Sequence, residues 1–295
     1  MNGNDGGAKY ALAAYGIWGL APLYFVWVGF AGPFEILSHR ILWSILLLGV
    51  LLTVLGRWSI MRQLNLRAAG ALFISGVLIA SNWGVYVWAI DQERLVQASL
   101  GYYLNPIVNV ALGVLLLREQ LRPLQWLAVL FAGLGVAHEI IGVGGLPWIS
   151  LVLAFSFAFY GFVRKLVGVD PLVGLFLETL LVGPLALWYL WQLTAAGQAS
   201  TPAGDWWPFV QLGLGGLVTI VPLLCFAAAA ARMPLAILGF YQYLAPTLGL
   251  FLAVGLFGEP FDSGQVVTFG LIWLALLVFS LEAWMTERRR RRVLA

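Results

Sequence analysis

Three ionisable side chains, Glu35, His39 and Arg40, stand within an otherwise apolar segment, FEILSHRILWSILLL at 34–48. An imidazole titrates near neutral pH and can carry a proton, whereas a guanidinium stays charged and recognises carboxylates. An arginine near a bilayer centre costs about 2.5–3.5 kcal/mol on insertion scales. Arg40 is therefore expected to face protein or a wet cavity and to find an acceptor. Glu139 is the first candidate for that acceptor and Glu35 is the second. A pair with Glu139 is either structural or part of a substrate or coupling site.

A further carboxyl group, Glu178, lies in a second apolar segment, LVGLFLETLLVG at 172–183, with no basic residue near it in the sequence. Ionisable groups inside membrane helices often mark proton relays or substrate pathways. Glu178 is therefore the first candidate for proton coupling. His39 is open to two interpretations, a proton carrier or a hydrogen-bonded structural histidine.

The composition indicates that these groups are surrounded by lipid. The chain has 295 residues, of which 62% are hydrophobic and 10% are charged, whereas soluble domains are typically about 25% charged. A membrane-spanning helix needs about 20 apolar residues. Ten segments qualify: about 10–28, 34–55, 68–90, 98–117, 124–142, 148–166, 172–193, 208–231, 235–257 and 265–285. The predicted fold class is an all-α integral membrane protein.

The basic residues orient these spans. With the arginine run at 288–292 in the cytoplasm, an even number of spans places both termini there. All basic residues except Arg40 and Arg94 then fall on that side, Arg164 and Lys165 among them. The run is interpreted as a topology anchor, and no nucleic-acid partner is predicted. The single cysteine, without a CxxC or Cys/His cluster, predicts no metal or other cofactor.

Two similar segments reveal an internal repeat. LGYYLNP at 100–106 and LGFYQYLAP at 238–246 both run from Leu-Gly-aromatic-Tyr to a proline inside a span. They lie on the fourth and ninth spans, and a shift of five spans inverts the second half relative to the first. Helices interrupted near such prolines are typical of inverted-repeat transporters. Glu119 and Glu259, equally far beyond the two prolines, are expected at the N-terminal end of the next helix, where the helix dipole favours them.

A second match supports the repeat. Pro33 stands seven residues before Arg40, and Pro171 stands seven before Glu178, on the second and seventh spans. The predicted organisation is a first five-helix repeat over 8–143, a second, inverted repeat over 147–285, and a basic cytoplasmic tail over 286–295.

Several short motifs carry a resemblance to a known family. They are EILSHR (35–40), NWGVYVWA (82–89), SLGYYLNP (99–106), ET (178–179), TIVPL (219–223) and FYQYLAPT (240–247). In order and spacing, the chain resembles the RarD group of EamA-domain proteins in the drug/metabolite transporter superfamily. The resemblance implies two EamA repeats, ten spans and a role in transport, often export. It also implies that spans 5 and 10 buttress a cavity or form a homo-oligomer contact.

A rise of 1.5 Å per residue places the polar groups of the first repeat in the outer half of the membrane and those of the second in the inner half. Such side chains either line a cavity or bond neighbouring helices. The predicted substrate-binding or coupling residues are Glu35, His39, Arg40, Asn82, Trp83, Tyr102, Tyr103, Asn105, Asn109, His138, Glu139, Glu178, Thr179, Thr219, Tyr241, Gln242 and Tyr243.

The predicted function is secondary transport of a small organic solute by alternating access, with proton coupling as an option. Candidate solutes are an amino acid, a metabolite or a drug such as chloramphenicol, exported across a bacterial inner membrane. The alternative is a passive facilitator, channel or lipid scramblase. No HExxH or GxSxG motif and no paired aspartates within the spans point to an intramembrane enzyme. The expected partners are the solute and the lipid bilayer.

Overall fold

The computed structural model describes residues 3–92, 94–142, 144, 148–201, 204–258 and 263–294. Ten helices or helix pairs in it are long and apolar enough to cross a membrane, which confirms the predicted spans. The elements are α1 (Gly3–Trp27), α2 (Pro33–Val54), α3 (Trp58–Arg62), α4 (Leu66–Asp91), α5 (Leu95–Leu115), α6 (Pro123–Gly142), α7 (Trp148–Val167), α8 (Pro171–Ala195), α9 (Trp207–Ala230), α10 (Leu235–Gln242), α11 (Leu244–Gly255) and α12 (Ser263–Leu294).

Prolines begin several of these helices. Pro33, Pro123 and Pro171 are the first residues of α2, α6 and α8, where a missing backbone N–H breaks no helical hydrogen bond. Before α8, the Asp170 carboxylate accepts hydrogen bonds from the N–H groups of Leu172 and Val173, at 3.0 and 3.3 Å. The start of α8, and with it the height of Glu178, is therefore fixed by the local sequence.

The two prolines inside the repeats act differently. The ninth span is divided at Tyr243 into α10 and α11, three residues before Pro246. Pro106, in contrast, lies within α5 and does not end it. The prediction of two equivalent interruptions is therefore wrong for the first repeat. A proline inside a helix removes one hydrogen bond, and the helix can bend without ending there.

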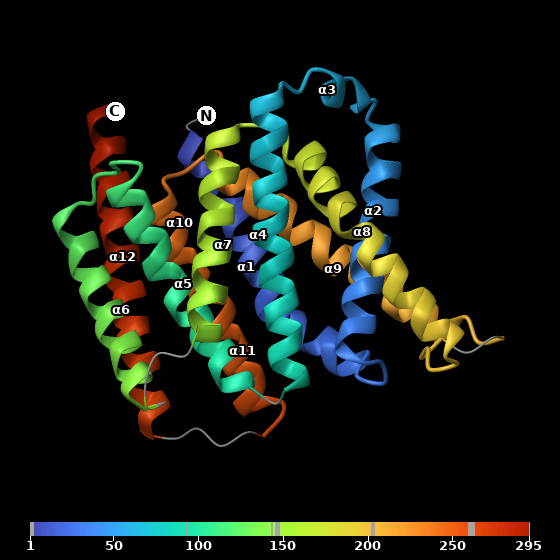
Figure 1. Ribbon diagram of the computed structural model, residues 1–295. Helices are drawn as coiled ribbons and strands as arrows, with labels where there is room; N and C mark the ends of the chain where they lie inside the picture. Colours follow the sequence, from blue (N-terminus) through green and yellow to red (C-terminus); the bar gives the residue numbers. More distant parts are fainter. Residues whose placement is uncertain are drawn as a thin grey trace.

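The helix contacts come in matching pairs, one from each half of the chain. Helix α1 packs against α9 and α11, and α7 packs against α4 and α5. Helix α2 packs against α9, and α8 against α4. The remaining large contacts join equivalent helices, which are α2 with α8, α5 with α10, and α6 with α12. Figure 1 shows α6 and α12 side by side at one edge of the bundle.

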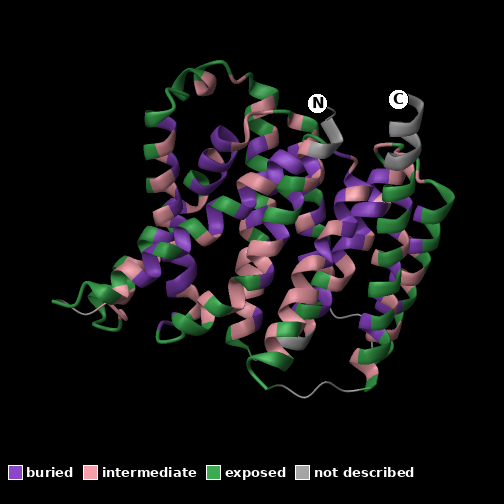
Figure 2. Ribbon diagram, turned by 180° about the vertical axis from the view of Figure 1, so that it is seen from behind, coloured by how far each residue is buried: buried purple, intermediate pink, exposed green. Residues whose placement is uncertain are grey.

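Both termini lie at one end of the bundle (Figure 1). Buried residues gather where the helices meet, and exposed ones cover the outer surfaces (Figure 2). Large apolar side chains such as Leu185, Trp191 and Phe251 are at least 60% exposed. Large apolar side chains exposed in this number suit a lipid environment.

Glu119 connects the two halves. Its carboxylate accepts hydrogen bonds from the N–H groups of Leu235 and Ala236, at 2.8 Å each, and so caps α10. The prediction named the next helix, α6, but the turn after α5 places Glu119 beside the other half of the chain. Glu259 lies outside the described residues, and so do the side chains of the 288–292 run.

Candidate functional site

Arg40 is held in the second turn of α2, where it faces α9. Its Nε donates a hydrogen bond to Thr219 Oγ1 at 2.8 Å, and that hydroxyl donates to the Gly215 carbonyl at 2.8 Å. A Cβ on Gly215 would lie 2.6 Å from Arg40 Cγ. Glycine at 215 therefore makes room for the arginine between the two helices.

Aromatic side chains surround the guanidinium. Its carbon lies 5.3 Å from the ring centroid of Phe25 and 6.0 Å from that of Trp83, within the range of cation–π attraction. The rings of Tyr86 and Tyr102 meet edge-on with centroids 5.7 Å apart, and both hydroxyls interact electrostatically with Arg40. Helices α1, α4, α5 and α9 thus enclose this charge.

No carboxylate of the described residues forms an ion pair with Arg40, so both predicted acceptors are wrong. Glu139 accepts a hydrogen bond from Thr268 of α12 at 2.9 Å. Glu35 accepts two from Ser200, through the backbone N–H and the hydroxyl, at 2.8 Å each. Depth along the helix allowed a pair with Glu139, but α6 packs mainly against α12.

The Arg40 cluster is accessible. Arg40 is only half-buried, and Tyr102 is 45% exposed. His39 is turned to another side of α2, where its buried ring packs edge-on against Phe209 with centroids 6.0 Å apart. His39 therefore lies beside the cluster and is not part of it.

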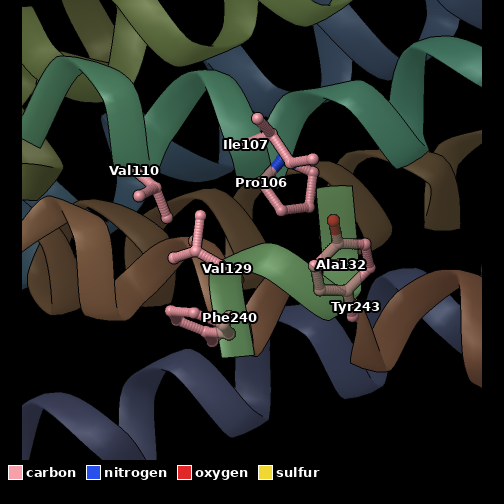
Figure 3. Close-up of a pocket in the computed structure, with 8 residues that line it drawn as sticks. Pro106, Ile107, Val110, Val129, Ala132, Phe240 and Tyr243 are labelled. Carbon is pink, nitrogen blue, oxygen red and sulfur yellow. The ribbon is translucent and has the colours of Figure 1, made fainter. Parts of the chain in front are cut away.

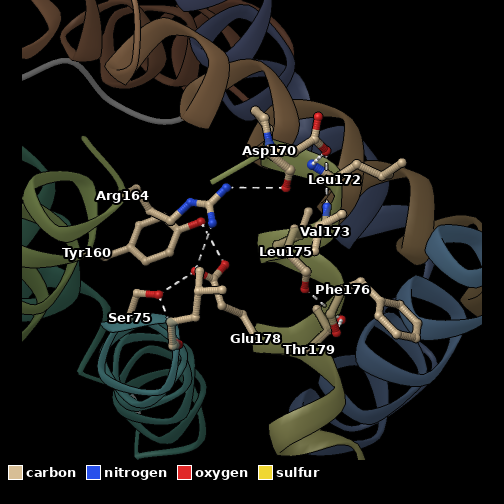
Figure 4. Close-up of polar contacts among 12 residues, drawn as sticks. Ser75, Tyr160, Arg164, Asp170, Leu172, Val173, Leu175, Phe176, Glu178 and Thr179 are labelled. Carbon is tan, nitrogen blue, oxygen red and sulfur yellow. Dashed lines mark hydrogen bonds and ion pairs between the residues drawn. The ribbon is translucent and has the colours of Figure 1, made fainter. Parts of the chain in front are cut away.

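Glu178 lies in a buried cluster that also contains the positively charged Arg164 (Figure 4). Its carboxylate accepts hydrogen bonds from Ser75 Oγ of α4 and from the Tyr160 hydroxyl of α7, the latter at 3.3 Å. Arg164 Nη1 lies 3.5 Å from Glu178 Oε1, and both side chains are almost completely buried. The expectation of a lone carboxyl group is therefore wrong.

Arg164 belongs to the interior, although its position at the end of a span suggested a cytoplasmic surface. Its Nη2 donates to the Pro171 carbonyl at 3.3 Å. A Cβ on Gly174 would collide with the guanidinium, so glycine at 174 lets Arg164 lie across α8. The guanidinium thereby joins α7 to the first turns of α8.

Arg40 and Glu178 hold equivalent places in the two halves. Each stands seven residues after the proline that begins its helix. Each faces a tyrosine from the first helix of its half, Tyr24 or Tyr160, and a hydroxyl from the other half, Thr219 or Ser75. The two clusters are therefore built alike around side chains of opposite charge, Arg40 and Glu178, but only Glu178 has an oppositely charged partner among the described residues.

Three amide side chains meet where α5 crosses α10. Asn109 Nδ2 donates to Gln242 Oε1 at 2.8 Å and to Asn105 Oδ1 at 3.2 Å. Around the same crossing, Pro106 and Tyr243 line an apolar cavity of about 10 Å³ (Figure 3), which is room for about one water. These amides join the two halves of the chain by hydrogen bonds. The prediction allowed such side chains either to line a cavity or to bond neighbouring helices, and these three bond neighbouring helices.

The other predicted residues make helix contacts. Asn82 donates to the Leu153 carbonyl and to Ser156 Oγ, at 2.9 and 3.0 Å. Thr179 bonds to carbonyls of its own helix. The aromatic and α6 residues contact neighbouring helices: Tyr103 packs on Phe269, Tyr241 on Phe279, Tyr243 donates to the Tyr103 carbonyl, and His138 bonds Thr268.

The prediction placed Arg40, Trp83 and Tyr102 in the outer half of the membrane, and the structure brings these three together. Thr219, which the prediction assigned to the polar group of the second repeat, joins them through its hydrogen bond with Arg40. The prediction missed Tyr24, Phe25 and Tyr86 around Arg40, and Ser75, Tyr160 and Arg164 around Glu178. Matching the two repeats helix by helix is a signal that could have found Tyr24 and Tyr160 together.

Ten spans in two matching halves, with charged side chains held between them, define a multi-pass membrane protein built like a transporter. The EamA-like transporter family matches residues 6–138 and 144–281. The chain belongs to this family, which is one of transporters and not of enzymes.

Relatives and a solved structure agree with this assignment. The chain is 50% identical over 288 residues to an uncharacterised transporter of Pseudomonas aeruginosa, with 96% of each chain covered. It is 42% identical over 285 residues to the protein RarD of Escherichia coli, again with 96% of each covered. At 32% identity it matches the chloramphenicol-sensitive protein RarD of Pseudomonas aeruginosa, covering 88% of this chain and 87% of the relative. A crystal structure with 18% identity has a TM-score of 0.73, covers 95% of this chain and 99% of its own, and shows the same fold.

Proposed function

We propose that this protein is a secondary transporter that moves a small organic solute across the bacterial inner membrane by alternating access. The matching helix contacts of the two halves carry the proposal. Each contact of α1 and α2 has a counterpart made by α7 and α8. The two halves can therefore exchange their packing arrangements, which gives two conformations of the whole protein. Carriers built from inverted repeats use two such conformations to open their binding site first to one side of the membrane and then to the other.

The proposed topology inverts the second repeat and places both termini in the cytoplasm. The connections between α2 and α4, between α5 and α6 and between α9 and α10 lie at the end of the bundle that holds the termini (Figure 1). By their positions in the sequence, these connections carry Arg57, Arg62, Arg118, Arg122 and Arg232. The positive-inside rule assigns that side to the cytoplasm. Arg40 then belongs to the outer half of the membrane and Glu178 to the inner half.

The two clusters are in different states, which supports alternating access. Hydrogen bonds and an ion pair around Glu178 join α4, α7 and α8. The Arg40 cluster has no such ion pair within the described chain, and part of it is accessible. We interpret the structure as closed on the cytoplasmic side.

Transport by purified protein in liposomes tests the proposal. The solute pool contains amino acids, small metabolites and chloramphenicol, with export as the expected direction in the cell. Uptake is measured with and without a pH gradient for the wild type, Glu178→Gln and a matched control, Glu282→Gln. Glu282 is also a buried carboxylate with an arginine partner, Arg122 at 2.6 Å, but it lies on α12, away from both clusters.

Saturable uptake of at least one solute, absent from empty liposomes, is the expected result. A rate that rises with the pH gradient, and loses that rise only in Glu178→Gln, assigns proton coupling to Glu178. Flux that rises in proportion to solute concentration, without saturation, contradicts a carrier and favours a passive route.

A further inference from the structure

We infer that Arg40 and the aromatic side chains around it bind the carboxylate of a compact organic monoanion. This inference rests on the proposed transport function, and it names the class of solute. It starts from a charge in the proposed outer half of the membrane that has no acid partner among the described residues.

The guanidinium has free capacity for a ligand. Of its three nitrogens, only Nε makes a hydrogen bond to a described residue, Thr219. The two terminal nitrogens make none within that part of the chain. A carboxylate matches such a pair of donors with two parallel hydrogen bonds.

Three other arginines pair with a carboxylate, whereas Arg40 lies among the helices without one in the described part of the chain. Arg164 has Glu178, Arg122 has Glu282, and Arg57 has Asp170. Glu178 and Glu282 lie on α8 and α12, and Asp170 directly precedes α8, so in each case the fold supplies an acid from another segment of the chain. At Arg40 it supplies aromatic rings and hydroxyls instead.

The side chains around Arg40 indicate the chemistry of the part of the ligand beyond its carboxylate. Phe25 and Trp83 flank the guanidinium with ring faces, and Tyr102 is 45% exposed beside it. Groups on helices α1, α4, α5 and α9 lie around Arg40, which is half-buried. One positive charge with apolar walls suits a single carboxylate on an aliphatic or aromatic body, and it does not suit a phosphate dianion.

Matched pairs of carboxylates and amides test this inference. Phenylacetate with phenylacetamide, and isovalerate with isovaleramide, differ mainly in charge. Binding is measured by thermal stabilisation of the full chain in nanodiscs, and flux by competition for uptake in liposomes. The variants are Arg40→Gln, Arg40→Lys and a control, Arg94→Gln, which removes an arginine stacked over Trp88 between α4 and α5.

We expect the wild type and Arg94→Gln to bind the carboxylates better than the amides. Arg40→Gln should weaken carboxylate binding by about 10- to 100-fold, as expected for lost hydrogen bonds to a charged group. Arg40→Lys keeps the charge without the planar fork and should fall between the two. If Arg40→Gln does not fold, the Arg40→Lys ratio of carboxylate to amide binding decides the question.

The outcomes separate this inference from the transport proposal. Transport of neutral solutes with no preference for carboxylates, unchanged in the Arg40 variants, overturns the inference and leaves transport standing. Carboxylate binding that depends on Arg40, without flux of any solute, supports the site and contradicts transport. Absence of carboxylate binding at millimolar concentration in the wild type overturns the inference.

Discussion

Breaking the ion pair between Glu178 and Arg164 should destabilise the fold more than removing both charges together. The two charges are 3.5 Å apart and their side chains are 0% and 2% exposed. At an effective dielectric constant of about 20, their attraction is about 5 kcal/mol. Removing one partner of such a pair leaves a buried charge and typically costs about 3–5 kcal/mol. Arg164→Met and Glu178→Leu should each lower the free energy of unfolding by about that amount.

The double variant, Arg164→Met with Glu178→Leu, tests whether an unpaired buried charge causes this loss of stability. Replacing both charges with apolar side chains leaves no orphan charge, so the double variant should lie within about 2 kcal/mol of the wild type. The magnitude of the coupling energy from the cycle should then be at least about 4 kcal/mol. Reversible unfolding in mixed micelles, followed by tryptophan fluorescence, provides the four stabilities.

The hydroxyl that supports the carboxylate provides a control. Ser75→Ala removes one neutral donor to Glu178 and should cost about 0.6–1.7 kcal/mol, the range of polar contacts in membrane bundles. Single-variant costs that simply add in the double variant, with a coupling energy below about 0.5 kcal/mol, would refute the role of the pair.

Three further substitutions test single contacts by the same unfolding measurement. Glu119→Ala removes the cap on the first two N–H groups of α10 and should cost about 1–2 kcal/mol; an unchanged stability would show that the cap is dispensable. Gly174→Val places a side chain where the Arg164 guanidinium lies, so its cost should match that of Arg164→Met and vanish in that background. Gly135→Leu faces a backbone carbonyl of α12 only 3.0 Å from its Cβ position, so it should push α6 from α12 and cost about 1–3 kcal/mol; a stabilised protein would contradict this contact.

The membrane spans could be predicted from the sequence because they depend on local properties. Length, apolar composition and starting prolines act within one segment, and Pro33 and Pro171 begin helices as expected. The positions of Arg40 and Glu178 along their helices follow from the same helix starts. The family resemblance, confirmed by the matches to EamA and RarD proteins, rests on short motifs of the same kind.

The partners of the charges could not be predicted, because they depend on which helices become neighbours. Glu139 has a suitable depth for Arg40 but lies on α6, which packs mainly against α12. Arg164 matched the rule for cytoplasmic anchors, and only the packing of α7 against α4 and beside α8 reveals it as the partner of Glu178. Depth is a property of one helix, whereas the direction of a side chain has meaning only in the assembled bundle.

Arg40 and Glu178 hold equivalent positions in the two halves but have opposite charges. This difference suggests how the two halves would take part in binding one solute. If the repeats exchange conformations, each cluster must be able to open and to close. The Glu178 cluster closes on Arg164, a cation from its own half of the chain. The Arg40 cluster has Tyr24 and Phe25 of α1 at the corresponding side and no described acid beside it. An anionic solute would supply the negative charge that the Arg40 cluster lacks. With the solute bound, Arg40 would be neutralised and hydrogen-bonded, as Glu178 already is by Arg164 without a ligand. The proposed site thus gives a reason for an arginine with no acid partner among the described residues, because the solute would supply the carboxylate.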